Sequence, residues 1–266
     1  MFKSLIRTFA IVAAFIAGYM MPGLHVYSWM FKWMLIVMLF VTFLGIRFKR
    51  MKPERAHWLL TGANLMVALA AWGVCRLVFG DGYLAQAAFF VGIMPTATAA
   101  PVVMGLLGGS VEFMLTALLL INGIICALLP FILPAVVGRG GFEIYLNVAQ
   151  NISLVMLLPL ALALAARRFY PRAIAWPRKL KDVTFGIWVV ILVLIAANAS
   201  YDISSREGIS ERVVEQIGVI ALLVCGVNFG LGYLLGGRTR AAECSQALGQ
   251  KNTTLSIYLA LTYASP

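Results

Sequence analysis

A run of polar residues interrupts the last apolar segment of this 266-residue chain. It reads A-L-G-Q-K-N-T-T over residues 247–254 and contains Gln250, Lys251 and Asn252 in succession. Its ammonium, amide and hydroxyl groups can bind an anion, carry a proton or replace a bound cation. Polar and charged side chains are costly inside a membrane, so a run of them there is typical of a functional site.

A second apolar segment is broken by prolines. The stretch G-I-M-P-T-A-T-A-A-P covers residues 92–101 and places Thr96 and Thr98 between two prolines. Proline lacks the backbone donor of a helix and clashes with the preceding turn, so we expect the helix to unwind here. Counted at about 1.5 Å per residue from the start of their segments, Pro95 and Lys251 each lie roughly 16 Å deep. Because the hydrocarbon core is about 30 Å thick, both breaks reach its midplane.

The polar groups of the two breaks allow two interpretations. In one, they only satisfy the backbone groups that an unwound helix leaves unpaired. In the other, some of them line a binding site, where the partial positive charge of half-helix N-termini also suits an anionic carboxylate. The candidate binding residues are Pro95, Thr96, Thr98, Pro101, Gln250, Lys251, Asn252, Thr253 and Thr254.

Lys251 carries the highest expected cost of these residues. An ionised lysine at the bilayer centre costs about 2.5–3.5 kcal/mol on insertion scales. Three functional roles would explain it. In the first, its ammonium replaces a bound cation and holds the broken helices together. In the second, its protonation is coupled to transport, and in the third, it pairs with an anionic substrate. The other interpretations are a purely structural pairing and a position nearer the membrane surface.

The elements that must position these residues are membrane helices. Hydrophobic residues make up 62% of the chain and charged residues 12%, with a mean hydropathy of +0.94. Soluble domains have roughly 45–50% apolar residues and about 25% charged residues. A soluble enzyme, a secreted disulfide scaffold and a disordered regulator are therefore excluded. Because a spanning helix needs about 20 mostly apolar residues, we predict an all-α polytopic membrane protein with nine spans. They cover residues 4–22, 29–46, 57–79, 84–107, 111–137, 146–166, 183–199, 214–236 and 241–266.

The location of charge predicts the orientation of the chain. The net charge is +11, but the basic residues cluster in short gaps between spans, which favours membrane topology over nucleic-acid binding. With a cytoplasmic N-terminus, fifteen of the twenty Lys and Arg residues outside the last span lie on the inside. The positive-inside rule therefore predicts a cytoplasmic N-terminus. We expect a multi-pass protein of the cell membrane, which is the inner membrane in a bacterium.

Other classes of membrane protein fit less well. Intramembrane proteases need paired aspartates, an HExxH motif or a serine–histidine pair at membrane depth. Here Asp81, Asp182 and Asp202 fall in loops, and both histidines fall at span ends. The chain has no phosphate-binding glycine loop, so an ATP-driven pump is not expected either. We predict no enzymatic activity, and a channel or a membrane sensor is the alternative from a different class.

The two breaks take corresponding places in the two halves of the chain. One lies in the fourth span, and the other lies in the ninth, which is the fourth after a glycine-rich gap near residue 138. Interrupted helices at corresponding positions are typical of a secondary transporter built from inverted repeats. We predict a first repeat over residues 1–138, with spans 1–5, and a second over residues 139–266, with spans 6–9 and the tenth span apparently absent.

Three segments together resemble one transporter family. V-N-F-G-L-G-Y-L-L-G at residues 227–236 precedes A-L-G-Q-K-N-T-T-L-S at residues 247–256, and M-P-T-A-T-A-A-P-V occupies residues 94–102. They resemble the eighth-, ninth- and fourth-helix motifs of the bile acid:sodium symporter family. The resemblance implies a ten-helix inverted repeat, with a panel domain from spans 1, 2, 6 and 7 and a core domain from spans 3–5, 8 and 9. It also implies broken, crossing helices 4 and 9 that hold two sodium ions, and transport of an organic anion by alternating access.

Most of that family's sodium ligands are replaced in this chain. By the resemblance, the ninth-helix glutamate falls on Ala247 and the glutamine on Lys251, and only Asn64, near the third-helix glutamine, keeps an oxygen. Sodium is a hard cation that prefers oxygen ligands, as calcium does. We therefore expect sodium coupling of the family type to be lost. The other replaced ligand positions fall on or near Ala100, Pro101, Met114 and Leu118.

These observations predict a secondary active transporter of a small organic anion, bile-acid-like or a carboxylate, with Lys251 in place of a sodium ligand. The alternative is sodium-coupled symport through a rearranged site, so sodium and proton both stay open as the coupling ion. Asn122, Asn228 and Glu243 are weaker site candidates, because helix packing or, for Glu243, a surface ion pair explains them at least as well. The expected partners are the organic anion and membrane lipid, with no cofactor, metal or nucleic acid, in a monomer or weak homodimer.

Overall fold

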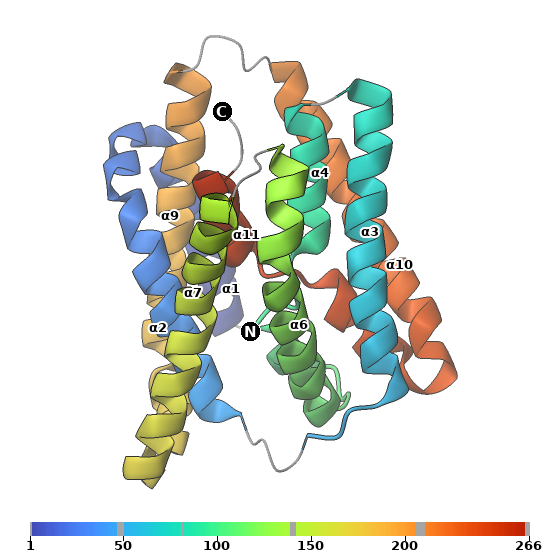
Figure 1. Ribbon diagram of the computed structural model, residues 1–266. Coiled ribbons are helices and arrows are strands. Elements are labelled where there is room, and N and C mark those ends of the chain that lie inside the picture. Colours follow the sequence, from blue (N-terminus) through green and yellow to red (C-terminus); the bar gives the residue numbers. More distant parts are fainter. Residues whose placement is uncertain (1, 47–50, 81, 139–141, 206–210, 264–266) are drawn as a thin grey trace. The chain divides into compact units, whose positions relative to one another are not determined.

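The computed structural model describes residues 2–46, 51–80, 82–138, 142–205 and 211–263 of the chain (Figure 1). Over these residues the backbone is nearly all helical, and no strand is found. Among them, six helical stretches are long and apolar enough to cross a membrane. The predicted all-α membrane fold is therefore confirmed. The six stretches are Pro22–Gly45, Arg55–Phe79, Val111–Val137, Tyr145–Phe169, Asp182–Ser204 and Arg212–Gly249.

The helices follow the predicted spans, with short 3-10 and α-helical connections between some of them. In chain order they are α1 (Phe2–Met20), η1 (Pro22–Trp29), α2 (Met30–Gly45), α3 (Arg55–Phe79), α4 (Tyr83–Ile93), α5 (Ala100–Leu106), α6 (Val111–Val137), α7 (Phe142–Phe169), η3 (Pro171–Ala175), α8 (Trp176–Lys179), α9 (Lys181–Ser205), α10 (Glu211–Gly249) and α11 (Thr253–Tyr263).

The fourth and the last predicted spans are each divided between two helices. α4 ends at Ile93 and α5 begins at Ala100, so residues 94–99 are not helical. α10 ends at Gly249 and α11 begins at Thr253, which leaves residues 250–252 between them. The first gap coincides with the proline-bracketed stretch, as expected where a backbone donor is missing. The second gap coincides with the polar run.

α10 contains a chain reversal. Its backbone leaves helical geometry at Gly237, with φ of 57°, and again at Arg240. In a straight helix Phe229 and Ser245 would lie about 24 Å apart, but Ser245 Oγ donates to the Phe229 carbonyl oxygen at 2.9 Å. Glycine adopts a positive φ without the cost of a Cβ clash, so Gly237 permits the turn. The two arms of this hairpin correspond to the predicted spans at residues 214–236 and 241–266.

The chain forms two compact units, and each consists of two separate stretches of sequence. Unit 1 contains residues 1–45 and 155–210, and unit 2 contains residues 46–154 and 211–266. Unit 1 therefore holds α1, α2, α8, α9 and the second half of α7. Unit 2 holds α3 to α6, α10, α11 and the first half of α7.

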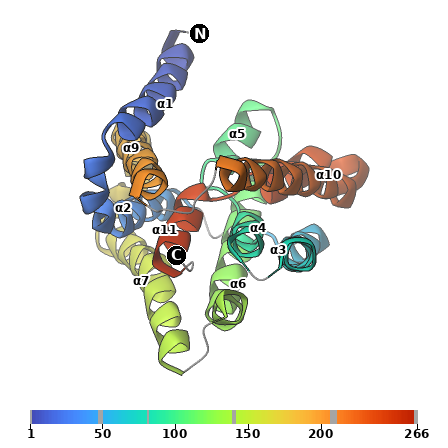
Figure 2. The ribbon, with the colours of Figure 1, turned by 90° about the horizontal axis from the view of Figure 1, so that it is seen from above.

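Unit 1 is built on the pair of helices α1 and α9, which run side by side in Figure 2. Gly18 of α1 lies directly against the Val193 carbonyl of α9, where a Cβ atom would clash. At the end of the pair, Ser200 Oγ donates to the Tyr19 carbonyl oxygen at 2.8 Å. A small residue and a hydroxyl thus allow two membrane helices to approach closely, as is common in membrane proteins.

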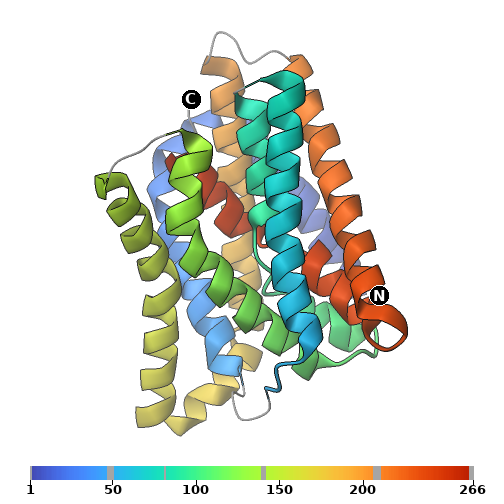
Figure 3. The ribbon, with the colours of Figure 1, turned by 45° about the vertical axis from the view of Figure 1, so that its right-hand side comes forward.

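Unit 2 is built around α3, which packs against α4, α6 and α10 (Figure 3). α3 and α4 approach closely, since a Cβ atom on Gly92 would lie 2.7 Å from Ala68 Cα. α6 begins with a capped end, since Ser110 Oγ accepts a hydrogen bond from the Phe113 N–H at 3.2 Å. It ends at Gly138, whose φ of 72° is left-handed. These contacts fix the helices that carry the two breaks.

Candidate functional site

The two breaks in unit 2 lie side by side and run in opposite directions. We call residues 94–99 and 250–252 the paired breaks. Thr96 and Lys251 form an isolated antiparallel bridge. The Ala97 N–H donates to the Gln250 carbonyl oxygen at 2.8 Å, and the Asn252 N–H donates to the Pro95 carbonyl oxygen at 2.9 Å. Each break therefore satisfies backbone groups that the other leaves unpaired.

Two side chains in the paired breaks bond to backbone groups. Thr96 is 1% exposed, and its hydroxyl donates to the Ala247 carbonyl oxygen at 2.7 Å. Asn252 is also buried, and its Oδ1 accepts from the Leu255 N–H at 3.2 Å, which caps the start of α11. The side chains of these two residues therefore bond backbone groups that the ends of α10 and α11 leave without a helical partner.

Lys251 binds oxygen atoms on the neighbouring helices. Its Nζ donates to Asn64 Oδ1 of α3 and to the Gly92 carbonyl oxygen of α4, the latter at 3.0 Å. Asn64 is 1% exposed, and its Nδ2 donates to the Ile93 carbonyl oxygen at 2.9 Å. The ammonium therefore occupies a small cradle of one amide oxygen and one backbone oxygen at the end of α4.

The two acceptors in this cradle are of one chemical kind. Both acceptors of Lys251 are neutral oxygen atoms, the ligand type that sodium and calcium take. The positions where the resemblance places further sodium ligands carry apolar side chains, and Ala247, Met114 and Leu118 are all fully buried. An ammonium supplies its own charge and three donors, so it can fill such a site without a carboxylate.

The remaining candidates lie in the paired breaks or in the first turns of α5 and α11. Pro95 and Pro101 are buried, Thr98 is half-buried and Thr253 is exposed. Gln250 is half-buried, and its Oε1 is buried without a hydrogen-bond partner among the described residues. The side chain of Thr254 lies outside the part of the chain that the structure describes.

Asn122 and Asn228 are buried in α6 and α10. Asn228 Nδ2 donates to the Val224 carbonyl oxygen one turn earlier, at 2.9 Å. The Oδ1 atoms of both residues lie buried with no hydrogen-bond partner in the described part of the chain. A bond across helices from Asn122 Oδ1 is therefore not found there.

The predicted ion pair of Glu243 is found, with Arg240 at 3.6 Å. The prediction that it lies at the surface is wrong, because Glu243 is only 8% exposed. The reversal in α10 folds it against the start of α6, where its Oε1 accepts from the Ser110 N–H at 3.1 Å. Arg240 also pairs with Glu54 at 3.1 Å and lies over the ring of Phe113. This cluster joins α3, α6 and α10 at the end of unit 2 where α3 begins.

Sequence reasoning missed one group in the lysine cradle and one in the cluster around Arg240. The Gly92 carbonyl binds Lys251, and a backbone oxygen carries no residue-type signal by which to find it. His57 is fully buried beside the Glu54–Arg240 pair, where its Nδ1 accepts from the Glu54 N–H at 2.8 Å and its Nε2 donates to the Phe113 carbonyl oxygen at 3.1 Å. Its position three residues after an acidic helix start is the signal of a capping box.

Comparison with known proteins adds no assignment. No known family profile matches the sequence, and no curated protein matches it.

Proposed function

We propose that this protein is a secondary active transporter of a small organic anion in the cell membrane, with its N-terminus in the cytoplasm. In this proposal, the Lys251 ammonium takes the permanent place of a coupling sodium ion. The observation that carries it is the cradle of Asn64 Oδ1 and the Gly92 carbonyl oxygen, to which Lys251 donates between two broken helices. Broken helices at membrane depth are the usual binding elements of secondary transporters.

The division of the chain supports alternating access. Unit 1 collects α1, α2 and α9, whereas unit 2 collects α3 to α6, α10 and α11. The bile acid:sodium symporter resemblance implies a panel domain and a core domain, and this division resembles them except at α7, which is split between the two units. Alternating access needs two bodies that can move as wholes, and two compact units are consistent with that requirement.

Two polar groups in and beside the paired breaks that are not fully engaged support a polar substrate. Gln250 Oε1 is buried without a partner in the described part of the chain, and the Thr253 side chain is exposed at the start of α11. The N-terminal turn of α11 also carries partial positive charge, which favours an anion. A carboxylate matches the start of α11, and a hydroxyl or N–H donor elsewhere on the same molecule would bond Gln250 Oε1.

The test is uptake into proteoliposomes of two labelled anions, taurocholate and cyclohexanecarboxylate. Each is measured with sodium, potassium or choline as the cation. We expect saturable uptake of at least one anion at the same rate in all three cations. Lys251→Gln should reduce that uptake by about tenfold or more, equivalent to about 1.4 kcal/mol. The exposed Lys179 provides the matched control, and Lys179→Gln should retain wild-type uptake.

Each other result assigns a different function. Sodium-dependent uptake would favour symport through a rearranged site, and wild-type uptake by Lys251→Gln would remove the role of the ammonium. Non-saturable flux would indicate a channel. If neither anion enters, the proposed substrate class is wrong.

A further inference from the structure

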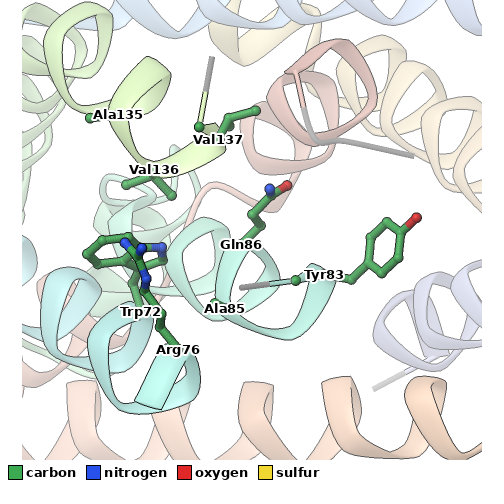
Figure 4. A pocket seen from close by; sticks show the side chains of 10 residues that line it. Trp72, Arg76, Tyr83, Ala85, Gln86, Ala135, Val136 and Val137 are labelled. Atoms are coloured by element: carbon green, nitrogen blue, oxygen red, sulfur yellow. The ribbon is translucent and has the colours of Figure 1, made fainter. Parts of the chain in front are cut away.

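Unit 2 contains a cavity far from the paired breaks. The cavity has a volume of about 450 Å³ and lies where α3 ends, α4 begins and α6 ends (Figure 4). Arg76 lines it, and this residue is twelve positions along α3 from Asn64, or about 18 Å along the helix axis. The cavity, called here the end cavity, is therefore distinct from the cradle that holds Lys251.

One wall of the end cavity is cationic and aromatic. The Arg76 guanidinium carbon lies 5.1 Å from the centroid of the Trp72 ring, in a cation–π arrangement that orients its planar fork. Gln86 of α4 also lines the cavity and points toward Val137 at the end of α6 in Figure 4. Arg76 and Gln86 make further interactions within the chain. A guanidinium has five N–H donors, which can serve such contacts and also bind a carboxylate through two of them.

The start of α4 adds positive potential to the same cavity. Gly82, the N-cap residue of this eleven-residue helix, has no side chain to cap it, and the first turn contains no acidic residue. Gly82 and Tyr83 both line the end cavity. No side-chain cap is found for this helix among the described residues, and its dipole favours a negatively charged ligand at this end.

Another part of the wall is apolar. Val136 and Val137 at the end of α6 and Ala85 in α4 line it, and all three are buried within the described chain. A wall of this kind suits the hydrocarbon body of a ligand rather than an inorganic ion. Cavities that bind small organic molecules commonly have about 300–1,000 Å³, and this one falls near the lower end of that range.

We propose that the end cavity binds an organic anion, a carboxylate or sulfonate on a body of one or two rings. Arg76 binds its charged group, and Val136, Val137 and the Trp72 ring contact its apolar body. This site would be separate from the paired breaks, and its occupancy does not depend on transport or on Lys251.

The test is equilibrium dialysis of the detergent-purified protein against labelled 2-naphthoate. We expect Arg76→Gln to weaken binding by about tenfold or more, the loss of a charge-assisted bidentate contact. Arg212, exposed at the start of α10, provides the matched control, and Arg212→Gln should bind 2-naphthoate like the wild type. Lys251→Gln should also bind like the wild type, which separates this proposal from the transport proposal.

Two further measurements keep the result clear if Arg76→Gln folds poorly. Val137→Trp, which fills the apolar wall, should abolish 2-naphthoate binding. The neutral isostere 2-naphthamide should bind the wild-type protein about tenfold more weakly than 2-naphthoate does. Equal binding of the two compounds, undiminished binding by folded Arg76→Gln, or no binding of 2-naphthoate at millimolar concentration would overturn the proposal. Displacement by phosphatidylglycerol at equal concentration would also overturn it, by assigning the cavity to a lipid headgroup.

Discussion

Lys251 and Thr96 close the paired breaks by different bonds. Lys251 donates from its ammonium to Asn64 Oδ1 and to the Gly92 carbonyl oxygen. Thr96 donates from a neutral hydroxyl to the Ala247 carbonyl oxygen at 2.7 Å. That carbonyl lies in the last turn of α10, where the helix itself supplies no partner. A single hydroxyl therefore satisfies a backbone group that would otherwise be buried and unpaired.

Thr96→Val should lower the free energy of unfolding by about 1–2 kcal/mol, because the Ala247 carbonyl oxygen loses its donor while the side-chain volume is kept. The readout is the melting temperature of the detergent-purified protein. For a chain of this size, about 1 kcal/mol corresponds to a shift of about 2–4 °C. Thr262→Val is the control, since the Thr262 hydroxyl also bonds a carbonyl, at 2.6 Å, but its side chain is exposed. Equal shifts in the two variants would contradict this role of Thr96.

At the scale of helices, the contact between α3 and α4 positions the cradle. Gly92 faces Ala68 so closely that a Cβ atom would lie 2.7 Å from Ala68 Cα. The same glycine presents its carbonyl oxygen to Lys251. Helix separation and the lysine cradle are therefore set by one position.

Gly92→Ala should lower the free energy of unfolding by about 1–3 kcal/mol, the usual cost of overpacking, by forcing α3 and α4 apart. Gly62→Ala in α3 is the matched control, because nothing lies within 4 Å of a Cβ atom there. An alanine in an open helical position is neutral or stabilises the helix by up to about 1 kcal/mol. The measurement is the melting temperature of each variant. A Gly92→Ala protein that melts at the wild-type temperature would refute the tight contact.

The helices and the places where they break could be predicted from the sequence, but their pairing could not. Apolar runs predicted the spans, and the prolines and the polar run predicted the gaps after Ile93 and Gly249. The antiparallel bridge between Thr96 and Lys251 joins residues 155 positions apart, which no local pattern specifies. The burial of Glu243 was missed for the same reason, since it depends on the reversal at Gly237 that folds α10 back on itself.

At the scale of the whole molecule, two compact units alternate along one chain. Segments before residue 46 and from residue 155 to residue 210 form one unit, and the remainder forms the other. The lysine cradle lies within unit 2 alone, so a permanent ammonium would keep that unit rigid without a bound ion. A sodium-coupled transporter would instead gain stability in unit 2 only when sodium is present.

The most direct test of this account is the melting temperature of the purified wild-type protein in sodium, potassium and choline chloride at equal ionic strength. If the Lys251 ammonium fills the cation site, the three melting temperatures will be the same, because no cation binds preferentially to the folded state. A melting temperature that rises with the logarithm of the sodium concentration, and not with potassium or choline, would show a surviving sodium site. That result would contradict the central claim.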